Sequence, residues 1–185
     1  RGKDPFCDPF CGSGTIAIEA ALIAKNRAPG LDRNFSAQKW KNMDTKLWLE
    51  AGDEAMDKEF HGTYDIWGGD IDPAAVELAK HNAELAGVED CIRFEVADAT
   101  KFHRDSEYGQ LVTNPPYGER LMEKKEAEDL YRAFGKAMRD MPPKWRILVL
   151  SSHTEFERCF GKPADKKRKL YNGMLKCDLF MYGVK

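Results

Sequence analysis

The chain has 185 residues, of which 42% are hydrophobic, 11% aromatic and 32% charged, so it can bury a core of its own without disulfide or metal cross-links. Its longest aliphatic run is residues 147–150, whereas a membrane-spanning helix needs about 18 apolar residues, which excludes a transmembrane protein. The net charge of −2 excludes a uniformly basic chain that binds polyanions over its whole surface.

The charge is nevertheless unevenly distributed. Residues 144–176 carry nine basic and three acidic side chains, a local net charge of +6, so the rest of the chain carries −8. This segment fits two interpretations, a contact with an anionic partner or a solvated lysine-rich loop.

The cysteines favour a reduced, cytoplasmic protein because their number is odd and, apart from the first two, they lie far apart. Cys7 and Cys11 are spaced like metal ligands, but no second Cys/His pair with short spacing accompanies them, so we expect no metal site. Arg1 and Gly2 begin no basic-then-apolar leader, and we expect neither a secretory segment nor a membrane partner. Because the chain starts so close to a predicted strand, we expect it to be a fragment of a longer protein.

Short apolar runs alternate with helical patterns, which predicts an α/β fold with a parallel sheet and crossover helices. A strand at 6–8 is followed by a Gly-rich turn and by a helix whose apolar residues at 16–23 leave little polar face, so we expect that helix to be buried. A Trp-rich stretch at about 30–63 predicts a helical insertion packed by its tryptophans.

A second strand is predicted over 64–69 and ends at Asp70. Asp72 followed by Pro73 predicts the start of a helix that runs towards Gly87. Further strands are predicted at 92–96, 110–113, 146–151 and 177–182, and part of a helix at 130–141. Without an internal repeat or a visible boundary, we expect one domain over residues 1–185.

The motif Asp-Pro-Phe-Cys-Gly-Ser-Gly-Thr, residues 8–15, lies between a predicted strand and a predicted helix, the arrangement of a cofactor-binding turn. Its glycines allow a ligand to approach the backbone closely, and a helix N-terminus offers unpaired N–H groups. The glycines and Ala17 also fit the dinucleotide pattern G-x-G-x-x-A. Against NAD, the acidic residue that binds the ribose is expected about 20 residues after the glycines, whereas Asp70 lies much further on, beyond the Trp-rich stretch, and Asp8 would lie near a pyrophosphate. A carboxylate there suits an ammonium group, which S-adenosylmethionine carries.

Two more carboxylates follow predicted strands. Asp70 ends the second strand, where a carboxylate can accept both hydroxyl protons of a ribose. Asp98 follows the third strand, where it could accept the amino hydrogens of an adenine, although any loop Asp would look the same. Asp72 is explained by its role as a helix cap.

The motif Asn114-Pro115-Pro116-Tyr117 follows the apolar strand that ends at Thr113. Paired prolines alone commonly stop a strand, but that does not explain the flanking Asn and Tyr. An exocyclic amine of a base is a poor nucleophile because its lone pair is delocalised into the ring. The Asn114 side-chain oxygen and the Pro115 carbonyl could draw its hydrogens out of the ring plane, while Tyr117 stacks on the base. The four scattered histidines are assigned no chemistry, namely His61, His81, His103 and His153.

Together these two motifs resemble the class I S-adenosylmethionine-dependent amino-methyltransferases. Three further stretches are similar, over nearly the whole chain, to the bacterial THUMP-domain RNA methyltransferases of the type that methylates N2 of a guanine in 23S ribosomal RNA. The stretches are Ala28-Pro29-Gly30-Leu31 with Arg33-Asn34-Phe35 and Trp40, then Gly118-Glu119-Arg120, then Lys166-Lys167-Arg168-Lys169-Leu170-Tyr171-Asn172-Gly173.

The resemblance implies a Rossmann-like seven-stranded sheet, mostly parallel with helices on both faces and an antiparallel final strand. It also implies S-adenosylmethionine as cofactor and S-adenosylhomocysteine as product, with Asp8 at the methionine end, Asp70 at the ribose and Asp98 at the adenine. The cofactor-binding residues expected are Asp8, Phe10, Cys11, Gly12, Gly14, Thr15, Asp70, Ile71, Asp98, Ala99 and Asn114. The residues expected to hold the target base are Asn114, Pro115, Pro116 and Tyr117.

We therefore expect a cytoplasmic enzyme that methylates 23S rRNA, with phosphate contacts from the basic stretch at 166–169 that weaken with salt. The THUMP region of that family has no counterpart in these residues. Three other functions remain open: methylation of a protein glutamine amide, methylation of DNA adenine, and RNA or cofactor binding without catalysis. The Trp-rich insertion and the basic tail argue against a protein amide as the substrate. The lack of a recognisable target-recognition domain argues against DNA adenine. The complete set of expected catalytic residues argues against a protein that binds without catalysis.

Overall fold

The structure is a computed structural model and describes residues 4–31, 33–118 and 121–184. Its centre is one seven-stranded sheet with the strand order β3-β2-β1-β4-β5-β7-β6. The pairs among β1 to β5 are parallel, and β7 is antiparallel to both of its neighbours. The strands are β1 (Phe6–Asp8), β2 (Ile66–Asp70), β3 (Ile92–Val96), β4 (Tyr108–Thr113), β5 (Lys144–Ser151), β6 (Lys166–Asn172) and β7 (Leu175–Tyr182). This arrangement confirms the predicted mostly parallel, Rossmann-like sheet.

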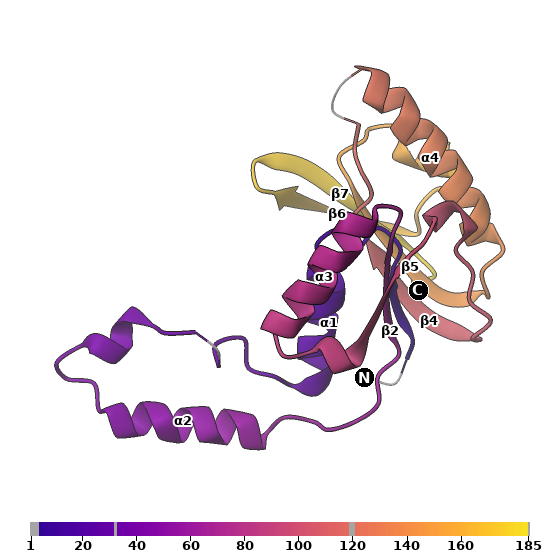
Figure 1. Ribbon diagram of the computed structural model, residues 1–185. Helices are drawn as coiled ribbons and strands as arrows, with labels where there is room; N and C mark the ends of the chain where they lie inside the picture. Colours follow the sequence, from indigo (N-terminus) through magenta and orange to yellow (C-terminus); the bar gives the residue numbers. More distant parts are fainter. Residues whose placement is uncertain (1–3, 32, 119–120, 185) are drawn as a thin grey trace.

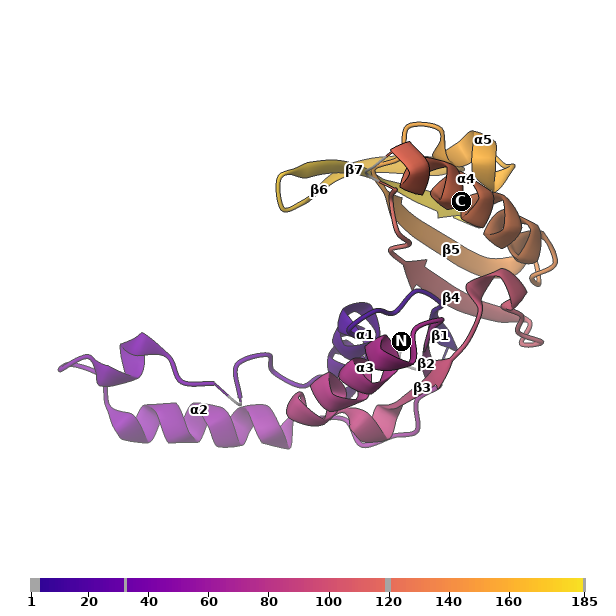
Figure 2. The same ribbon diagram turned by 45° about the horizontal axis from the view of Figure 1, so that its top comes forward.

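Helices cover both faces of this sheet (Figures 1 and 2). On one face lie α1 (Thr15–Lys25) and α3 (Pro73–Leu85), and on the other lie α4 (Leu121–Arg139) and α5 (Phe156–Phe160). Three short 3₁₀ helices occupy connections, η1 (Ser36–Lys39), η2 (Glu89–Cys91) and η3 (Ala99–Lys101). As predicted, Asp72 caps α3 through its Oδ1, which accepts a hydrogen bond from the Ala74 N–H at 2.9 Å, and Pro73 is the first helical residue.

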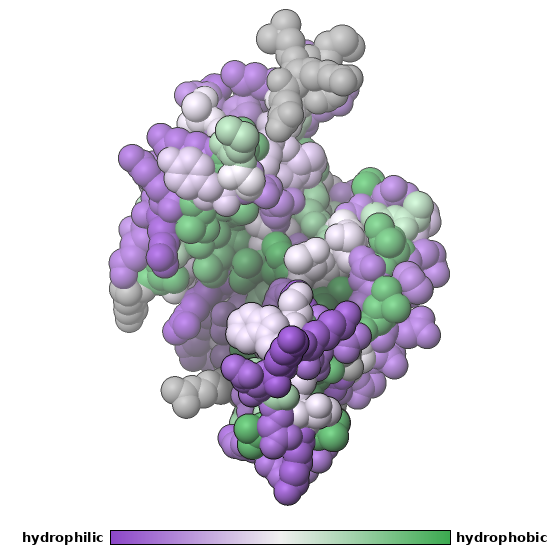
Figure 3. Space-filling model, turned by 90° about the vertical axis from the view of Figure 1, so that its left-hand side faces the viewer, coloured by the Kyte–Doolittle hydropathy of each residue, from purple (hydrophilic) through white to green (hydrophobic). Residues whose placement is uncertain are grey.

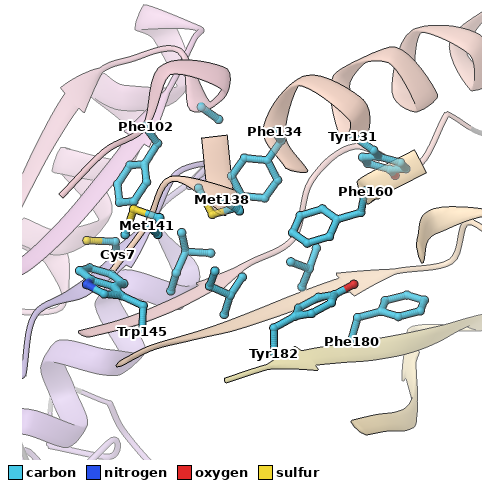
Figure 4. Packing of buried hydrophobic residues seen from close by; sticks show 14 of the residues in the cluster. Cys7, Phe102, Tyr131, Phe134, Met138, Met141, Trp145, Phe160, Phe180 and Tyr182 are labelled. Atoms are coloured by element: carbon cyan, nitrogen blue, oxygen red, sulfur yellow. The ribbon is translucent and has the colours of Figure 1, made fainter. Parts of the chain in front are cut away.

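The larger hydrophobic core lies between α4, α5 and the sheet, and half of its buried residues are aromatic (Figure 4). Helix α4 places Ala127, Tyr131, Phe134 and Met138 on one buried stripe because these residues recur every three or four positions. Phe156 packs against Tyr131 and Phe180 with ring centroids 4.9 and 4.6 Å apart. This side of the sheet is therefore closed, and it fixes the strands from which the functional residues emerge.

The opposite face is only partly covered, so the expectation that α1 is buried is wrong for one side of that helix. Ala17 and Ala21 are buried, but Ile23 is 78% exposed. Ile23 borders a groove of about 770 Å³, which is also lined by Val112 of β4. Figure 3 shows hydrophobic side chains gathered in a hollow on the side of the molecule from which the insertion and the β6–β7 hairpin project.

The insertion at about 30–63 contains η1 and a further helix, α2 (Thr45–Asp57), and projects from the body of the domain (Figures 1 and 2). Within α2 no residue is buried. Trp48 packs against Phe35 with ring centroids 5.7 Å apart, but Trp40 is 66% exposed. The prediction that tryptophans pack this segment is therefore wrong for Trp40, because no element of the described part of the chain covers that side chain.

All five cysteines are buried free thiols. Within the described ranges, no group of three or more His, Cys, Asp or Glu side chains is placed to hold a metal ion. In that same part of the chain, no helix combines the length and apolarity needed to cross a membrane.

Candidate active site

The predicted site residues converge on one edge of the sheet. Asp8 and Asp70 are the last residues of β1 and β2, Asp98 lies two residues after β3, and Asn114 comes directly after β4. Because these four strands are parallel, their carboxyl ends meet at the same edge. The chain reverses its direction of winding between β1 and β4, and ligands of open α/β sheets bind at such a switch point.

Asp8 is the most deeply buried carboxyl group of the site, with 1% of its surface exposed. Its Oδ1 accepts hydrogen bonds from the Thr113 hydroxyl at 2.6 Å and from the Phe10 N–H at 3.2 Å. Its Oδ2 is buried and has no hydrogen-bond partner among the described residues. Burial, assisted by the nearby charge of Asp70, raises the pKa of Asp8 to about 7. A buried acceptor without a donor fits a cationic ligand group at this position.

The glycine turn that follows leaves room for a ligand against the backbone. Gly14 has a φ of 85°, and a Cβ on it would lie 3.0 Å from the Ala79 Cβ, so only glycine fits. At Gly12, where φ is 50°, a Cβ would point into open space with nothing within 4 Å. Helix α1 begins at Thr15, and no side chain caps it. The N–H groups of its first turn therefore remain available to a ligand.

Asp70 connects the glycine turn to β2. Its Oδ2 accepts from the Gly12 N–H at 2.9 Å, and its Oδ1 accepts from the Asp72 N–H at 3.0 Å. A carboxylate offers about four acceptor positions, so both oxygens can still accept from ribose hydroxyls. The neighbouring Ile71 is 72% exposed at the rim of the same edge.

Asp98 has a structural task that the sequence did not reveal. Its Oδ1 accepts from the Thr100 N–H at 2.9 Å and from the Thr100 hydroxyl at 2.7 Å, and it caps η3. These hydrogen bonds lower the pKa of Asp98 and keep it ionised. Ala99 is buried under the same turn. The contact between Asp98 and an adenine stays a prediction.

The remaining predicted cofactor residues shape the turn. The Phe10 ring packs edge-on against Phe134 with centroids 5.2 Å apart. Burial raises the pKa of the Cys11 thiol to about 12, so this cysteine is no nucleophile. Thr15 is exposed, and its hydroxyl lies 3.2 Å from the Ser13 hydroxyl.

The Asn-Pro-Pro-Tyr loop leaves β4 next to Asp8. The Asn114 Oδ1 accepts a short hydrogen bond from the Tyr117 hydroxyl. Pro115 is fully buried, and the Pro116 carbonyl accepts from the Tyr131 hydroxyl at 2.7 Å. The Pro115 carbonyl accepts no hydrogen bond from the described part of the chain. The loop is therefore held at Pro116, and its Pro115 carbonyl has no donor among the residues that the structure describes.

Tyr117 closes the site on the side of β7. Its hydroxyl accepts from the Cys177 Sγ at 3.7 Å, and burial raises the pKa of Tyr117 to about 12, which keeps the phenol neutral. Tyr117 also borders a cavity of about 200 Å³ together with Lys124 and His153. Burial lowers the pKa of His153, whose ring packs edge-on against Tyr131 with centroids 5.6 Å apart.

Three residues of this site were not predicted. Thr113 joins the Asn114 loop to Asp8, Tyr131 fixes Pro116, and Cys177 contacts Tyr117. The only signal for Thr113 was a polar residue at the end of an apolar strand, and Tyr131 is an ordinary aromatic residue of a helix stripe. Of the family stretch Gly118-Glu119-Arg120, residues Glu119 and Arg120 lie outside the described residues.

Comparisons with known proteins agree with this geometry. YpsC of Bacillus subtilis (strain 168), named as a candidate RNA methyltransferase, is 45% identical over 182 residues, which are 98% of this chain and 47% of YpsC. Ribosomal RNA large subunit methyltransferase K/L of Shewanella baltica (strain OS185) is 42% identical over 180 residues, 95% of this chain and 25% of that protein. The chain thus spans half or less of the length of these curated relatives.

Among solved structures, SMU.472, a candidate methyltransferase in complex with S-adenosylhomocysteine (SAH), superposes with a TM-score of 0.94 at 41% identity. The match covers 100% of this chain and 49% of that one. The cofactor of this domain is S-adenosylmethionine, which fits the unpartnered Asp8 oxygen and the open space at Gly12. Residues 1–180 match the family described as "RMKL-like, methyltransferase domain", and the chain belongs to that family, UPF0020.

Proposed function

We propose that this chain methylates an exocyclic amine of an RNA base, N2 of a guanine in 23S rRNA. The observation that carries the proposal is the position of the Asn114 loop. The Asn114 amide oxygen and the Pro115 carbonyl, which accepts no hydrogen bond from the described residues, are acceptors on a rigid loop. Thr113 joins that loop to Asp8 at the cofactor-binding edge.

The cofactor supplies an electrophilic methyl group when it is bound. Around it, Asp8 would pair with the ammonium of the methionine moiety, Asp70 would accept from the ribose hydroxyls, and Asp98 would accept from the adenine amino group. The open space at Gly12 would receive the methionine end against the backbone.

Asn114 and Pro115 would act on the target amine. An amine conjugated with a purine ring has little lone-pair density outside the ring plane. Two acceptors that bind its hydrogens favour a tetrahedral nitrogen, whose lone pair can then form the new N–C bond. Because the Pro-Pro backbone is rigid and Tyr131 holds it, these acceptors are placed before the substrate binds. The nitrogen gains a methyl group and releases one proton to solvent, so no side-chain nucleophile is required.

Tyr117 would have two states. Without substrate, its hydroxyl occupies the Asn114 Oδ1 that the target amine needs. A bound base would displace this hydroxyl, and the Tyr117 ring could then stack on the base. The short contact thus keeps the acceptor satisfied in the free protein.

RNA is favoured as the substrate by the names of the relatives and by the charge of this chain. The relatives include a ribosomal RNA large subunit methyltransferase. Residues 144–176 carry a net charge of +6, and five of the basic side chains lie on β6 and β7, next to Cys177, which contacts Tyr117. An rRNA substrate would place the protein in the bacterial cytoplasm.

Labelled methyl transfer followed by nucleoside mass spectrometry tests this proposal. Unmodified 23S rRNA, a DNA duplex and a peptide with an internal glutamine are compared as acceptors. N2-methylguanosine in the rRNA is the expected product. N6-methyladenine in DNA or a methylated glutamine would contradict the proposed substrate. A protein that binds SAH but labels no acceptor would contradict the proposed activity.

A further inference from the structure

Strands β6 and β7 form a hairpin that projects beyond the carboxyl edge of the sheet (Figures 1 and 2). The last residue of β5, Ser151, pairs with Asp178, which in turn pairs with Lys169 of β6. Residues 170–177 therefore extend past the end of β5. Because Leu170 pairs with Cys177, the turn at Gly173 lies three residues beyond that pair, which is about 10 Å at about 3.3 Å per residue.

The base of this hairpin contacts the proposed catalytic loop. Cys177 is buried, and its Sγ lies 3.7 Å from the Tyr117 hydroxyl that bonds to Asn114. The base of the hairpin therefore lies next to the proposed position of the target base.

The hairpin is strongly cationic and free of acidic residues from 166 to 176, where it carries five Lys or Arg side chains. One of these charges is neutralised, because Lys167 pairs with Glu157 at 2.7 Å. Arg168, Lys169 and Lys176 are exposed and form no ion pair within the described ranges, although Asp178 lies opposite Lys169 in the register. These three side chains are available to an anionic partner.

An aromatic side chain shares one face of the hairpin with Lys169 and Lys176, whereas Arg168 points to the other face. Tyr171 is 72% exposed and pairs across the hairpin with Lys176, so the two share one face. Met174, at the turn, is fully exposed. An exposed planar ring flanked by lysines is the combination with which proteins bind unpaired nucleic acid, by stacking on a base and neutralising phosphates.

We propose that the β6–β7 hairpin binds an unpaired RNA strand that flanks the target nucleotide. Arg168, Lys169 and Lys176 neutralise its phosphates, and Tyr171 stacks on one of its bases. This inference rests on the proposed function, because it takes RNA as the substrate. A duplex fits less well, because its bases are already stacked and offer no face to Tyr171.

Fluorescence anisotropy tests the hairpin without any methyl donor. The probes are a labelled single-stranded RNA of mixed sequence, the same sequence as a duplex, and inorganic polyphosphate as a competitor without bases. One variant neutralises the hairpin (Arg168→Gln, Lys169→Gln, Lys176→Gln). Its matched control neutralises three exposed cations at the opposite end of the sheet (Lys136→Gln, Arg139→Gln, Arg146→Gln), and Tyr171→Ala removes the ring.

Between about 50 and 200 mM salt, the hairpin variant should reduce the slope of log K against log[salt] by about 2, since each phosphate contact to a single strand contributes about 0.7. The control variant should keep the wild-type slope. Tyr171→Ala should weaken binding of the single strand by about five- to a hundredfold, with no change in the slope or in competition by polyphosphate.

Equal slopes for the hairpin and control variants would overturn the proposal, and so would wild-type affinity of Tyr171→Ala for the single strand. A preference of the wild type for the duplex, or no RNA binding at about 50 mM salt, would also overturn it. Circular dichroism melting curves verify that each variant is folded. Because no methyl transfer is measured, hairpin-dependent RNA binding stands even when the methylation assay fails, and the two proposals can fail separately.

Discussion

Replacing Asp8 with Asn should change the pH dependence of folding, because Asp8 is a buried carboxyl group whose pKa is raised. In the folded chain its pKa is about 7, compared with the ordinary value of 3.8. The folded state therefore holds this proton more tightly than the unfolded state. Asp8 contributes its full stability below pH 3.8 and loses it as the pH rises through about 7. Asn is neutral at every pH and keeps the acceptor for Thr113.

The size of the effect follows from the two pKa values. One pKa unit corresponds to about 1.4 kcal/mol, so full ionisation of Asp8 costs the folded state about 4 kcal/mol. Between about pH 5.5 and about pH 8, wild type should lose about 2 kcal/mol of unfolding free energy through this group. Asp8→Asn should lose none of it.

Urea denaturation at these two pH values measures this difference. Trp67 and Trp145 are buried and report unfolding by fluorescence. Relative to wild type, Asp8→Asn should gain about 2 kcal/mol of unfolding free energy when the pH rises from the lower to the higher value. The control is Asp4→Asn, which changes an exposed carboxyl group just before β1. Equal pH slopes for Asp8→Asn and wild type would refute the reasoning.

Three further predictions concern the site. SAH should bind wild type more tightly as the pH rises through about 7, because Asp8 then becomes a carboxylate for the ligand ammonium; calorimetry should find no such rise for Asp8→Asn. Asp70→Ala should raise the SAH dissociation constant at least tenfold, and an unchanged constant would exclude Asp70 as the ribose ligand. In single-turnover methylation, Tyr117→Phe should retain most of the rate because it keeps the stacking ring, whereas Tyr117→Ala should lose at least tenfold; equal rates would exclude stacking.

The fold was predictable where the sequence pattern is local. The strands at 6–8 and 92–96 have the predicted bounds, and Asp72-Pro73 marks the start of α3. Helix α4 is longer than predicted because it begins at Leu121, in a charged segment without an apolar signal. Strand β6 was not predicted, since Lys166–Lys169 looks like a solvated loop until β7 pairs with it. The five-residue helix α5 is too short to show a period.

The site was predictable in its residues but not in its contacts. Four polar residues at or just after the ends of four strands were recognised from their motifs and from the family resemblance, and the parallel strands bring these ends together. The hydrogen bond from Thr113 to Asp8 joins residues 105 positions apart, and the contact of Cys177 with Tyr117 joins residues 60 positions apart. Such contacts depend on strand order and register, which no local pattern encodes. The role of Asp98 as a cap for η3 was not predicted, because the sequence does not distinguish an Asp that caps a helix from an Asp that binds a ligand.

The central claim is that the Asn114 loop acts on the target amine and not on the cofactor. The most direct measurement compares wild type and Asn114→Ala in two assays, SAH binding by calorimetry and single-turnover methyl transfer to unmodified 23S rRNA. We predict SAH dissociation constants within about twofold of each other and a transfer rate at least a hundredfold lower for the variant, the size of effect found when one preorganised polar group is removed. Equal losses in both assays, or an unchanged transfer rate, would contradict the claim.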